Sequence, residues 1–106
     1  MKIVWTQNAL DDLKDIRSYL KTSESPAFVK KLTQDILDDV NSLKEWHTKG
    51  TFIPELEDLH LTMHRQLLTG QNRIIIERAD DVVYVHMIAH TRRDLEALIR
   101  RRLLNA

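Results

Sequence analysis

The spacing of apolar residues changes between the two halves of the chain, and this change constrains the fold most. The first half holds two apolar series with spacings of three and four residues, the period of one face of an α-helix. The first series is Ala9, Leu13, Ile16 and Leu20, and the second is Val29, Leu32, Ile36, Val40 and Leu43. Beyond residue 60 the pattern becomes short β-branched runs, which are typical of strands. The chain therefore predicts an α+β fold.

The signals at the helix starts indicate a helical hairpin. Thr6 can cap the first helix, and Ser25 followed by Pro26 is a cap with proline at the first helical position. Because the break over residues 22–25 is short, the two helices are expected to run antiparallel. The β-branched and aromatic run from Lys2 to Trp5 predicts a strand before them.

The second half predicts a three-stranded meander and a last helix. The strands are expected over residues 61–68, 73–78 and 82–89, with turns at 69–72 and 80–81. Residues 47–60 show no period and are interpreted as a loop. Thr91 is expected to cap a helix from about Asp94 to Leu104. Its inward face would be Leu95, Leu98, Ile99 and Leu103.

These elements predict one domain over residues 1–106, a length that suits a single compact core. The predicted architecture is an N-terminal strand, an α-helical hairpin packed on a mostly antiparallel four-stranded sheet, and a short C-terminal helix. The hairpin would cover one face of the sheet. The other face and the turns around it are expected to carry the Arg and His residues.

The net charge of zero hides a segregation of charge. The chain has 16 Lys and Arg against 16 Asp and Glu. Residues 1–58 carry seven Lys and one Arg against eleven acids, a net charge of −3, whereas residues 59–106 carry eight Arg against five acids, a net charge of +3. Arg grips phosphate or carboxylate in a bidentate fork, so the segregated Arg set indicates an anionic partner, with ordinary surface charge as the alternative.

Several classes of protein are excluded by composition. The absence of Cys removes disulfides, thiolate catalysis and Cys-based metal centres. Two glycines are too few for a phosphate-binding loop, and no Gly-x-Ser-x-Gly elbow is present. No stretch approaches the ~20 apolar residues of a membrane span, and no secretory signal precedes the first strand. We therefore expect a cytoplasmic protein without cofactors that does not act in a membrane.

The histidines do not predict a metal site. His60 and His64 are four residues apart, as are His86 and His90. On a helix this spacing brings two imidazoles together, but on a strand it separates them by roughly 13 Å. Both pairs lie in predicted strands, and no acidic ligand follows the expected local pattern, so no metal site is expected.

Metal-independent ribonuclease chemistry remains open at this point. Cleavage of RNA through its own 2′-hydroxyl needs a base, an acid and cations around the phosphate. Five residues form the candidate catalytic set if the strands bring them together. They are His64, Arg65, Arg73, His90 and Arg93, with Arg92 as a further cation nearby. The alternative for each is solvated charge at the surface or sheet edge.

A longer pattern resembles a known family. In residues 82–95 an apolar strand ends in His90, and Arg92, Arg93 and Asp94-Leu95 follow. The run Val4-Trp5-Thr6 with the helix after it, Pro54-Glu55-Leu56, and Arg73 followed by three Ile complete the pattern. In this order they resemble the RelE/ParE toxin superfamily, and more narrowly its ParE-like branch. The resemblance covers nearly the whole chain.

Departures from the family pattern bear on the activity. Asn72 and Ile76 stand where ParE relatives often have aromatic residues. The RelE-like, messenger-cleaving branch often carries a catalytic Tyr or His near its C-terminus. This chain ends Leu-Leu-Asn-Ala, and its only tyrosines are Tyr19 and Tyr84. The resemblance therefore favours the ParE-like branch over an endoribonuclease.

The resemblance implies a toxin of a type II toxin–antitoxin system, without catalytic residues of its own, that poisons DNA gyrase or a gyrase–DNA complex. The arginines near the C-terminus would bind this target: Arg92, Arg93, Arg100, Arg101 and Arg102. For the last three, stabilisation of a helix C-terminus is the alternative role. A RelE-like messenger endoribonuclease and a non-toxic member that only regulates transcription remain the alternatives for the protein.

The implied partner is a cognate antitoxin, ParD-like or another small type, in a hetero-oligomer with the toxin. It would add a strand at the first strand and lay a helix on the helical hairpin. The expected contacts are Ile3, Val4 and Trp5 on the strand, and Phe28 and Leu37 on the hairpin. For Phe28 and Leu37 a place in the core is the alternative.

Overall fold

The computed structural model describes residues 1–59 and 61–104, and it has the predicted order of elements. The main elements are β1 (Lys2–Trp5), α1 (Gln7–Leu20), α2 (Pro26–Asn41), β2 (His64–Thr69), β3 (Asn72–Ala79), β4 (Val82–His90) and α3 (Leu95–Ile99). Three short helical segments complete the order: η1 (Ser42–Lys44) and η2 (Pro54–Leu59) lie between α2 and β2, and η3 (Arg100–Leu104) follows α3. The predicted α+β class is confirmed.

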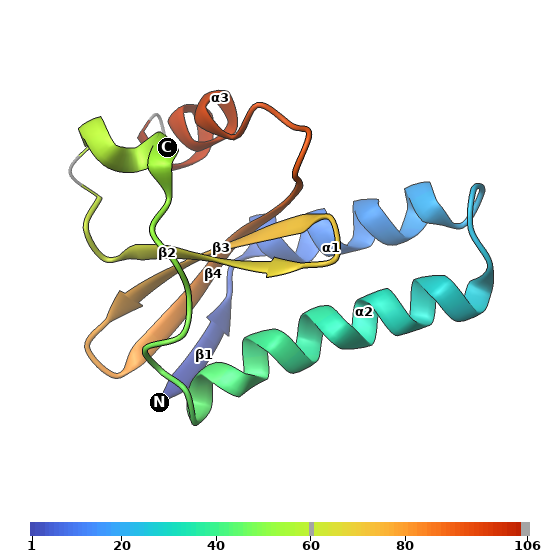
Figure 1. Ribbon diagram of the computed structural model, residues 1–106, viewed down its shortest axis with the longest axis horizontal. Helices are drawn as coiled ribbons and strands as arrows, with labels where there is room; N and C mark the ends of the chain where they lie inside the picture. Colours follow the sequence, from blue (N-terminus) through green and yellow to red (C-terminus); the bar gives the residue numbers. More distant parts are fainter. Residues whose placement is uncertain (60, 105–106) are drawn as a thin grey trace.

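The four strands form one sheet in the order β1-β4-β3-β2 (Figure 1). β1 runs parallel to β4, and the other two pairs are antiparallel. The meander turns at Gly70 and Asp80, whose φ angles are 60° and 55°. Both angles lie in the left-handed region, which Gly and Asp tolerate better than most residues. The predicted mostly antiparallel sheet is therefore confirmed.

Both long helices begin at the predicted caps. The side chain of Thr6 accepts a hydrogen bond from the Ala9 N–H, and that of Ser25 accepts one from the Phe28 N–H. Each bond satisfies one of the N–H groups that a helix start leaves without a partner. The C-terminal helix differs from the prediction, because Asp94 rather than Thr91 caps it and accepts from the Ala97 N–H.

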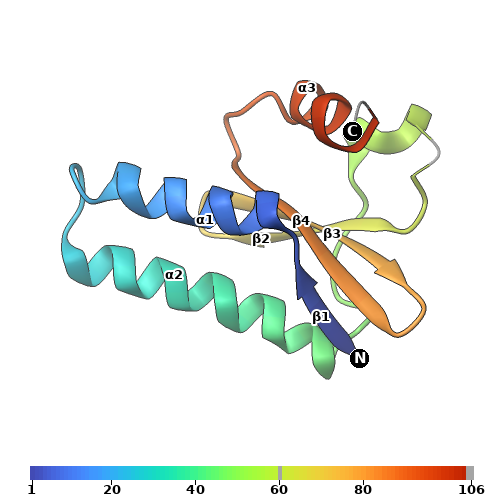
Figure 2. The same cartoon turned by 180° about the vertical axis from the view of Figure 1, so that it is seen from behind.

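The helical hairpin covers one face of the sheet, as predicted (Figure 2). Its buried apolar side chains meet alternate residues of three strands, since successive strand residues point to opposite faces. The buried members of this core are Ala9, Ile36, Val40, Leu43, Leu67, Ile74, Ile76, Val83, Val85 and Ile88. Burial of this set removes apolar surface of the hairpin and of the three strands from water, and this stabilises the packing of the hairpin on the sheet.

A second apolar core lies on the opposite face, where α3 and η2 pack side by side (Figure 1). Its buried members are Ile53, Leu56, Ile75, Met87, Ala89, Leu95, Leu98 and Ile99. The expectation that this face carries the Arg and His residues is wrong for the covered part. The loop expected over 47–60 also contains η2, whose six residues are too few to show a helical period in the sequence.

Two predictions fall outside the described part of the chain, namely those for His60 and for the Leu103 side chain. Within residues 1–59 and 61–104, no helix has the length and apolar character needed to cross a membrane.

A buried carboxylate ties the two ends of the chain to the sheet. β1 ends at Trp5 and pairs with β4 only as far as Val85, so no strand within residues 1–59 and 61–104 pairs with the rest of β4 on that side. The Thr6 hydroxyl donates to the Val85 carbonyl, and Asp12 accepts from the Ile88 N–H at 3.0 Å. Arg102 then donates twice to Asp12, at 2.6 and 2.8 Å. Asp12 thus joins α1, β4 and the C-terminal turn.

We expect Asp12→Asn to lower the free energy of unfolding by about 2–3 kcal/mol, because it removes the charge that Arg102 and the Ile88 N–H share. Denaturant unfolding followed by circular dichroism measures this loss. Asp11→Asn is the control, since Asp11 is exposed on the same helix and should change stability by less than about 0.5 kcal/mol. Equal effects of the two substitutions would contradict the role given to Asp12.

Candidate functional site

The segment after β4 presents arginines to solvent because its apolar residues face inward. Leu95, Leu98 and Ile99 are buried against the second core. The polar residues of the segment are consequently turned outward. Four arginines of the predicted target-binding set are exposed: Arg92, Arg93, Arg100 and Arg101.

These exposed guanidinium groups make few ion pairs with other residues of the chain. Arg100 pairs with Glu96 at 3.2 Å, one helical turn away, and both side chains are more than half exposed. Exposed ion pairs of this kind contribute little free energy, so Arg100 can readily exchange Glu96 for another anion. Among the described residues, Arg92, Arg93 and Arg101 make no ion pair within 4.0 Å. The segment therefore offers guanidinium donors to an external anion.

Arg102 differs from the other members of the predicted set. Its guanidinium is bound by the buried Asp12 carboxylate, and this hydrogen bonding raises the pKa of Arg102. A bidentate pair of this kind fixes the side chain. Arg102 therefore anchors the segment to α1, while its neighbours remain free to bind a partner.

His90 orders the turn that leads into the arginines. Its Nδ1 accepts from the Arg92 N–H at 3.1 Å, and its Nε2 lies 3.0 Å from Oε1 of Gln71. The Thr91 N–H also donates to the Gln71 carbonyl. These bonds hold the backbone at Arg92 in one conformation, which gives His90 a structural role.

The predicted ribonuclease set is not brought together. His64 pairs with Glu77 of β3 and His90 pairs with Asn72, five residues away along the same strand. An offset of five residues along a strand corresponds to roughly 17 Å. Because the offset is an odd number, His64 and His90 also point to opposite faces of the sheet. A base and an acid at that separation cannot act on one phosphate.

The two strand arginines of that set are already engaged. Arg65 donates to the carbonyls of Thr62 and His64, at 2.9 and 2.8 Å. Arg73 forms a bidentate pair with Glu55 at 2.7 and 2.8 Å. This pair fastens η2 to β3, and it lowers the pKa of Glu55 through the hydrogen bonds that Arg73 donates.

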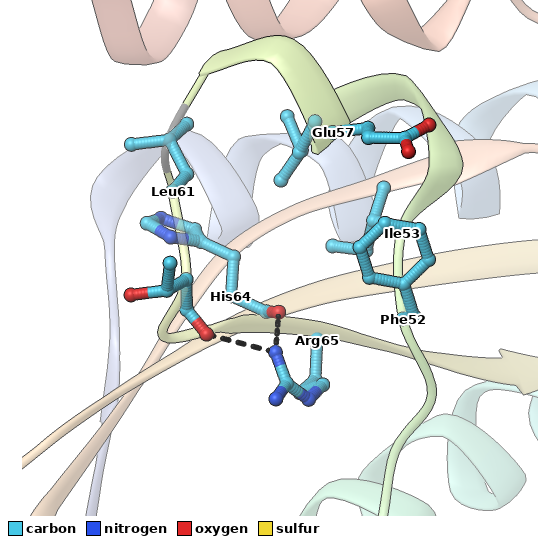
Figure 3. A pocket seen from close by; sticks show the side chains of 8 residues that line it. Phe52, Ile53, Glu57, Leu61, His64 and Arg65 are labelled. Atoms are coloured by element: carbon cyan, nitrogen blue, oxygen red, sulfur yellow. Dashed lines mark hydrogen bonds between the residues drawn. The ribbon is translucent and has the colours of Figure 1, made fainter.

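His64 lies in a small pocket between β2 and the segment before it (Figure 3). The pocket measures about 270 Å³, and its wall includes Phe52, Ile53 and Leu61. Burial lowers the pKa of His64, so the ring is neutral near pH 7. Its Nδ1 is buried without a hydrogen-bond partner among the described residues.

A cluster that sequence spacing does not predict adjoins this pocket. His64, Glu77 and His86 come from β2, β3 and β4, and their potential ligand atoms lie within 4.8 Å of one another. The local spacings His60/His64 and His86/His90 do not produce it, because the residues meet across strands. Only a correct strand register would have revealed it.

The residues predicted to meet an antitoxin lie on two surfaces. β1 is an edge strand that pairs with β4 alone among the described strands, so its other side is open to strand addition. Ile3 and Trp5 of this strand pack against the first core, while Val4 alternates to the opposite face. The other edge strand, β2, is partly covered because Thr51 and Gln66 exchange backbone hydrogen bonds at 2.9 Å.

On the helical hairpin, Phe28 is 45% exposed and Leu37 is half-buried, and neither belongs to the two buried cores. A groove of about 730 Å³ lies where α1 ends and α2 begins, and charged side chains contribute much of its wall. It is lined by Arg17, Lys21, Glu24, Pro26, Val29, Lys30, Thr33 and Gln34. Phe28 and Leu37 are thus on the hairpin surface but outside this groove.

The order of the elements and the sheet topology are those expected from the resemblance to the RelE/ParE superfamily. Residues 3–95 match the family described as the ParE toxin of the type II toxin–antitoxin system, parDE. The match extends from β1 to the start of α3, and the chain belongs to this family.

A solved structure described as the chromosomal ParDE TA system from P. aeruginosa has the same fold. It is similar to this chain with a TM-score of 0.69 and 21% sequence identity, over 85% of this chain and 95% of that chain. No curated protein matches the chain.

The Glu55–Arg73 pair predicts acid sensitivity of the region around η2. Because the pKa of Glu55 is lowered from 4.5 in the folded protein, the pair stabilises the fold above that pH, and its contribution is lost as the pH falls through the lowered value. Glu55→Gln should cost about 1–2 kcal/mol of unfolding free energy at pH 7, and this cost should shrink progressively as the pH falls below 4.5.

Urea unfolding at a series of pH values measures this difference. Glu57→Gln, at an exposed position in the same turn, is the control and should leave the pH dependence unchanged. A Glu55→Gln cost that does not fall at any pH between 7 and the onset of acid unfolding would contradict the assignment.

Proposed function

We propose that this ParE-family protein acts in the cytoplasm by poisoning DNA gyrase, and that a cognate antitoxin neutralises it by binding β1 and the helical hairpin. The observation that carries the target proposal is the exposed arginine segment, consisting of Arg92, Arg93, Arg100 and Arg101. Gyrase acting on DNA presents phosphates and carboxylates together, and the guanidinium fork binds both.

Arg102 supports this surface without being part of it. Its pair with Asp12 fixes the turn that follows α3 against α1. A fixed segment loses less conformational freedom on binding than a free tail would. The backbone that carries the arginines before it is therefore held against the body of the protein.

The antitoxin proposal rests on the open edge of β1 and on the exposed apolar side chain of Phe28. An added strand supplies main-chain hydrogen bonds to an edge, and an amphipathic helix supplies apolar contacts to a helical surface. Both surfaces lie away from the arginine segment along the sequence. One partner would thus need an extended part and a helical part to cover both.

The endoribonuclease alternative has less support. His64 and His90 are separated by five residues along the strand direction and point to opposite faces of the sheet. Arg73 is already paired with Glu55. A non-toxic regulator with the same fold is distinguished by the assay below, because it would trap no gyrase.

Charge reversal of the exposed arginines tests the target surface. We expect the double variants Arg92→Glu/Arg93→Glu and Arg100→Glu/Arg101→Glu each to need at least ~10-fold more protein to trap the same amount of cleaved DNA with purified gyrase, because each replaces attraction by repulsion. The amount of linear DNA released after detergent and protease treatment is the measurement.

Lys14→Glu/Lys44→Glu is the matched control, because it makes the same change of net charge at exposed positions outside the segment. It should trap gyrase as the unmodified protein does. Full trapping by both arginine variants, with their fold intact, would show that the segment is not the target contact.

A separate substitution tests the antitoxin surface. Phe28→Ala should weaken binding of the cognate antitoxin about 10-fold, since a partly exposed aromatic anchor on α2 is lost while the core is untouched. Isothermal titration calorimetry measures the affinity. Trp46→Ala, which removes an aromatic side chain that is 66% exposed and lies outside the hairpin helices, should leave it unchanged. If Phe28→Ala and Trp46→Ala bind the antitoxin with the same affinity, Phe28 is not part of the interface.

A further inference from the structure

A cluster of two histidines and one glutamate spans three neighbouring strands on one face of the sheet. His64 of β2 is directly opposite Glu77 of β3, which is opposite Tyr84 of β4. The pairing of β3 with β4 shifts between Ile75 and Ile76, so the extra residue His86 remains beside this row. A bulge of this kind re-aims a side chain, and here it brings His86 to Glu77.

The contacts within the cluster are close. Nε2 of His86 lies 2.8 Å from Oε1 of Glu77, and the rings of His64 and His86 stack with centroids 5.4 Å apart. One potential ligand atom from each residue lies within 4.8 Å of the other two. A small displacement of side chains would thus allow all three to reach one central atom.

One nitrogen of the cluster is buried without a hydrogen bond. His64 is 7% exposed, and its Nδ1 has no partner among the described residues. Buried polar atoms are nearly always satisfied, so this nitrogen calls for an explanation. The ring that carries it lies beside a second imidazole and a carboxylate, and imidazoles in such surroundings are suited to coordinate a cation.

We propose that His64, Glu77 and His86 form a binding site for a divalent transition-metal ion of the Zn²⁺ class. Two imidazoles and one carboxylate are a common three-residue ligand set for zinc, and they leave a fourth position for water. Tetrahedral Zn²⁺ with bonds of about 2.0–2.1 Å holds its ligand atoms about 3.3 Å apart, which lies between the 2.8 Å from His86 Nε2 to Glu77 Oε1 and the 4.8 Å within which all three ligand atoms fall.

The surroundings of the cluster fit an ion that enters from solvent. The side chains of His86 and Glu77 are 19% and 32% exposed, while His64 forms the buried wall. Mg²⁺ and Ca²⁺ prefer sites made of oxygen atoms, so two imidazoles select against them. A bound ion would link β2, β3 and β4 and stabilise the folded state, because it binds that state alone.

The test is titration of the tag-free, full-length protein with Zn²⁺, followed by calorimetry and thermal unfolding. We expect one Zn²⁺ per chain with a Kd of 10 μM or below, a rise in the unfolding temperature, and no rise with Mg²⁺. Co²⁺ should give the visible absorption bands of a tetrahedral site. His64→Gln, Glu77→Gln and His86→Gln should each weaken Zn²⁺ binding at least ~10-fold.

His90→Gln and His47→Gln are the matched controls, because both histidines lie outside the cluster, and they should bind Zn²⁺ as the unmodified protein does. Unfolding without metal is measured for every variant, and Glu77→Gln keeps the shape of the side chain should a His variant fail to fold. Absence of Zn²⁺ binding, or binding that survives Glu77→Gln unchanged, would overturn the proposal.

Discussion

The carboxylate of Asp12 is the interaction on which the arrangement of this protein depends. β1 is too short to pair with the whole of β4, so β4 needs another acceptor where β1 ends. Asp12 supplies it to the Ile88 N–H, and the same carboxylate binds Arg102. A single buried group thus completes the sheet and fixes the C-terminal turn. The position of the arginine segment follows from this junction.

The structure shows how the arginines behind the zero net charge are distributed between the body of the protein and its surface. Of the eight arginines after residue 58, four make hydrogen bonds to the body of the protein and four lie exposed on the C-terminal segment. The first group is Arg65, Arg73, Arg78 and Arg102, and the second is Arg92, Arg93, Arg100 and Arg101. The basic half of the sequence therefore serves both the fold and the surface proposed to meet gyrase.

Local sequence signals predicted the elements of the fold well. The caps at Thr6 and Ser25 act between residues three positions apart, and the helix and strand periods repeat over a few residues. The prediction of Thr91 as a cap was wrong because Asp94, closer to the buried Leu95, makes the bond instead. The order of the elements followed from these local signals, and the family resemblance agreed with that order and pointed to the arginine turn.

The contacts that define the sites were not predictable in this way. Asp12 reaches residues 76 and 90 positions away along the chain. Glu55 and Arg73 meet because η2 folds onto β3, and η2 itself is too short to show a period. His64, Glu77 and His86 come together only through the register of three strands and one bulge. Each of these contacts joins residues that are far apart in the sequence, so it can be recognised only in the folded structure and not from residue spacing.

The most direct test of the central claim is a single induction experiment in bacteria with two readouts taken from the same culture. One readout is the amount of gyrase covalently attached to DNA, and the other is the appearance of new 5′ ends in translated messages. The proposed function predicts accumulation of gyrase–DNA complexes with intact messages. Message cleavage without trapped gyrase would contradict it.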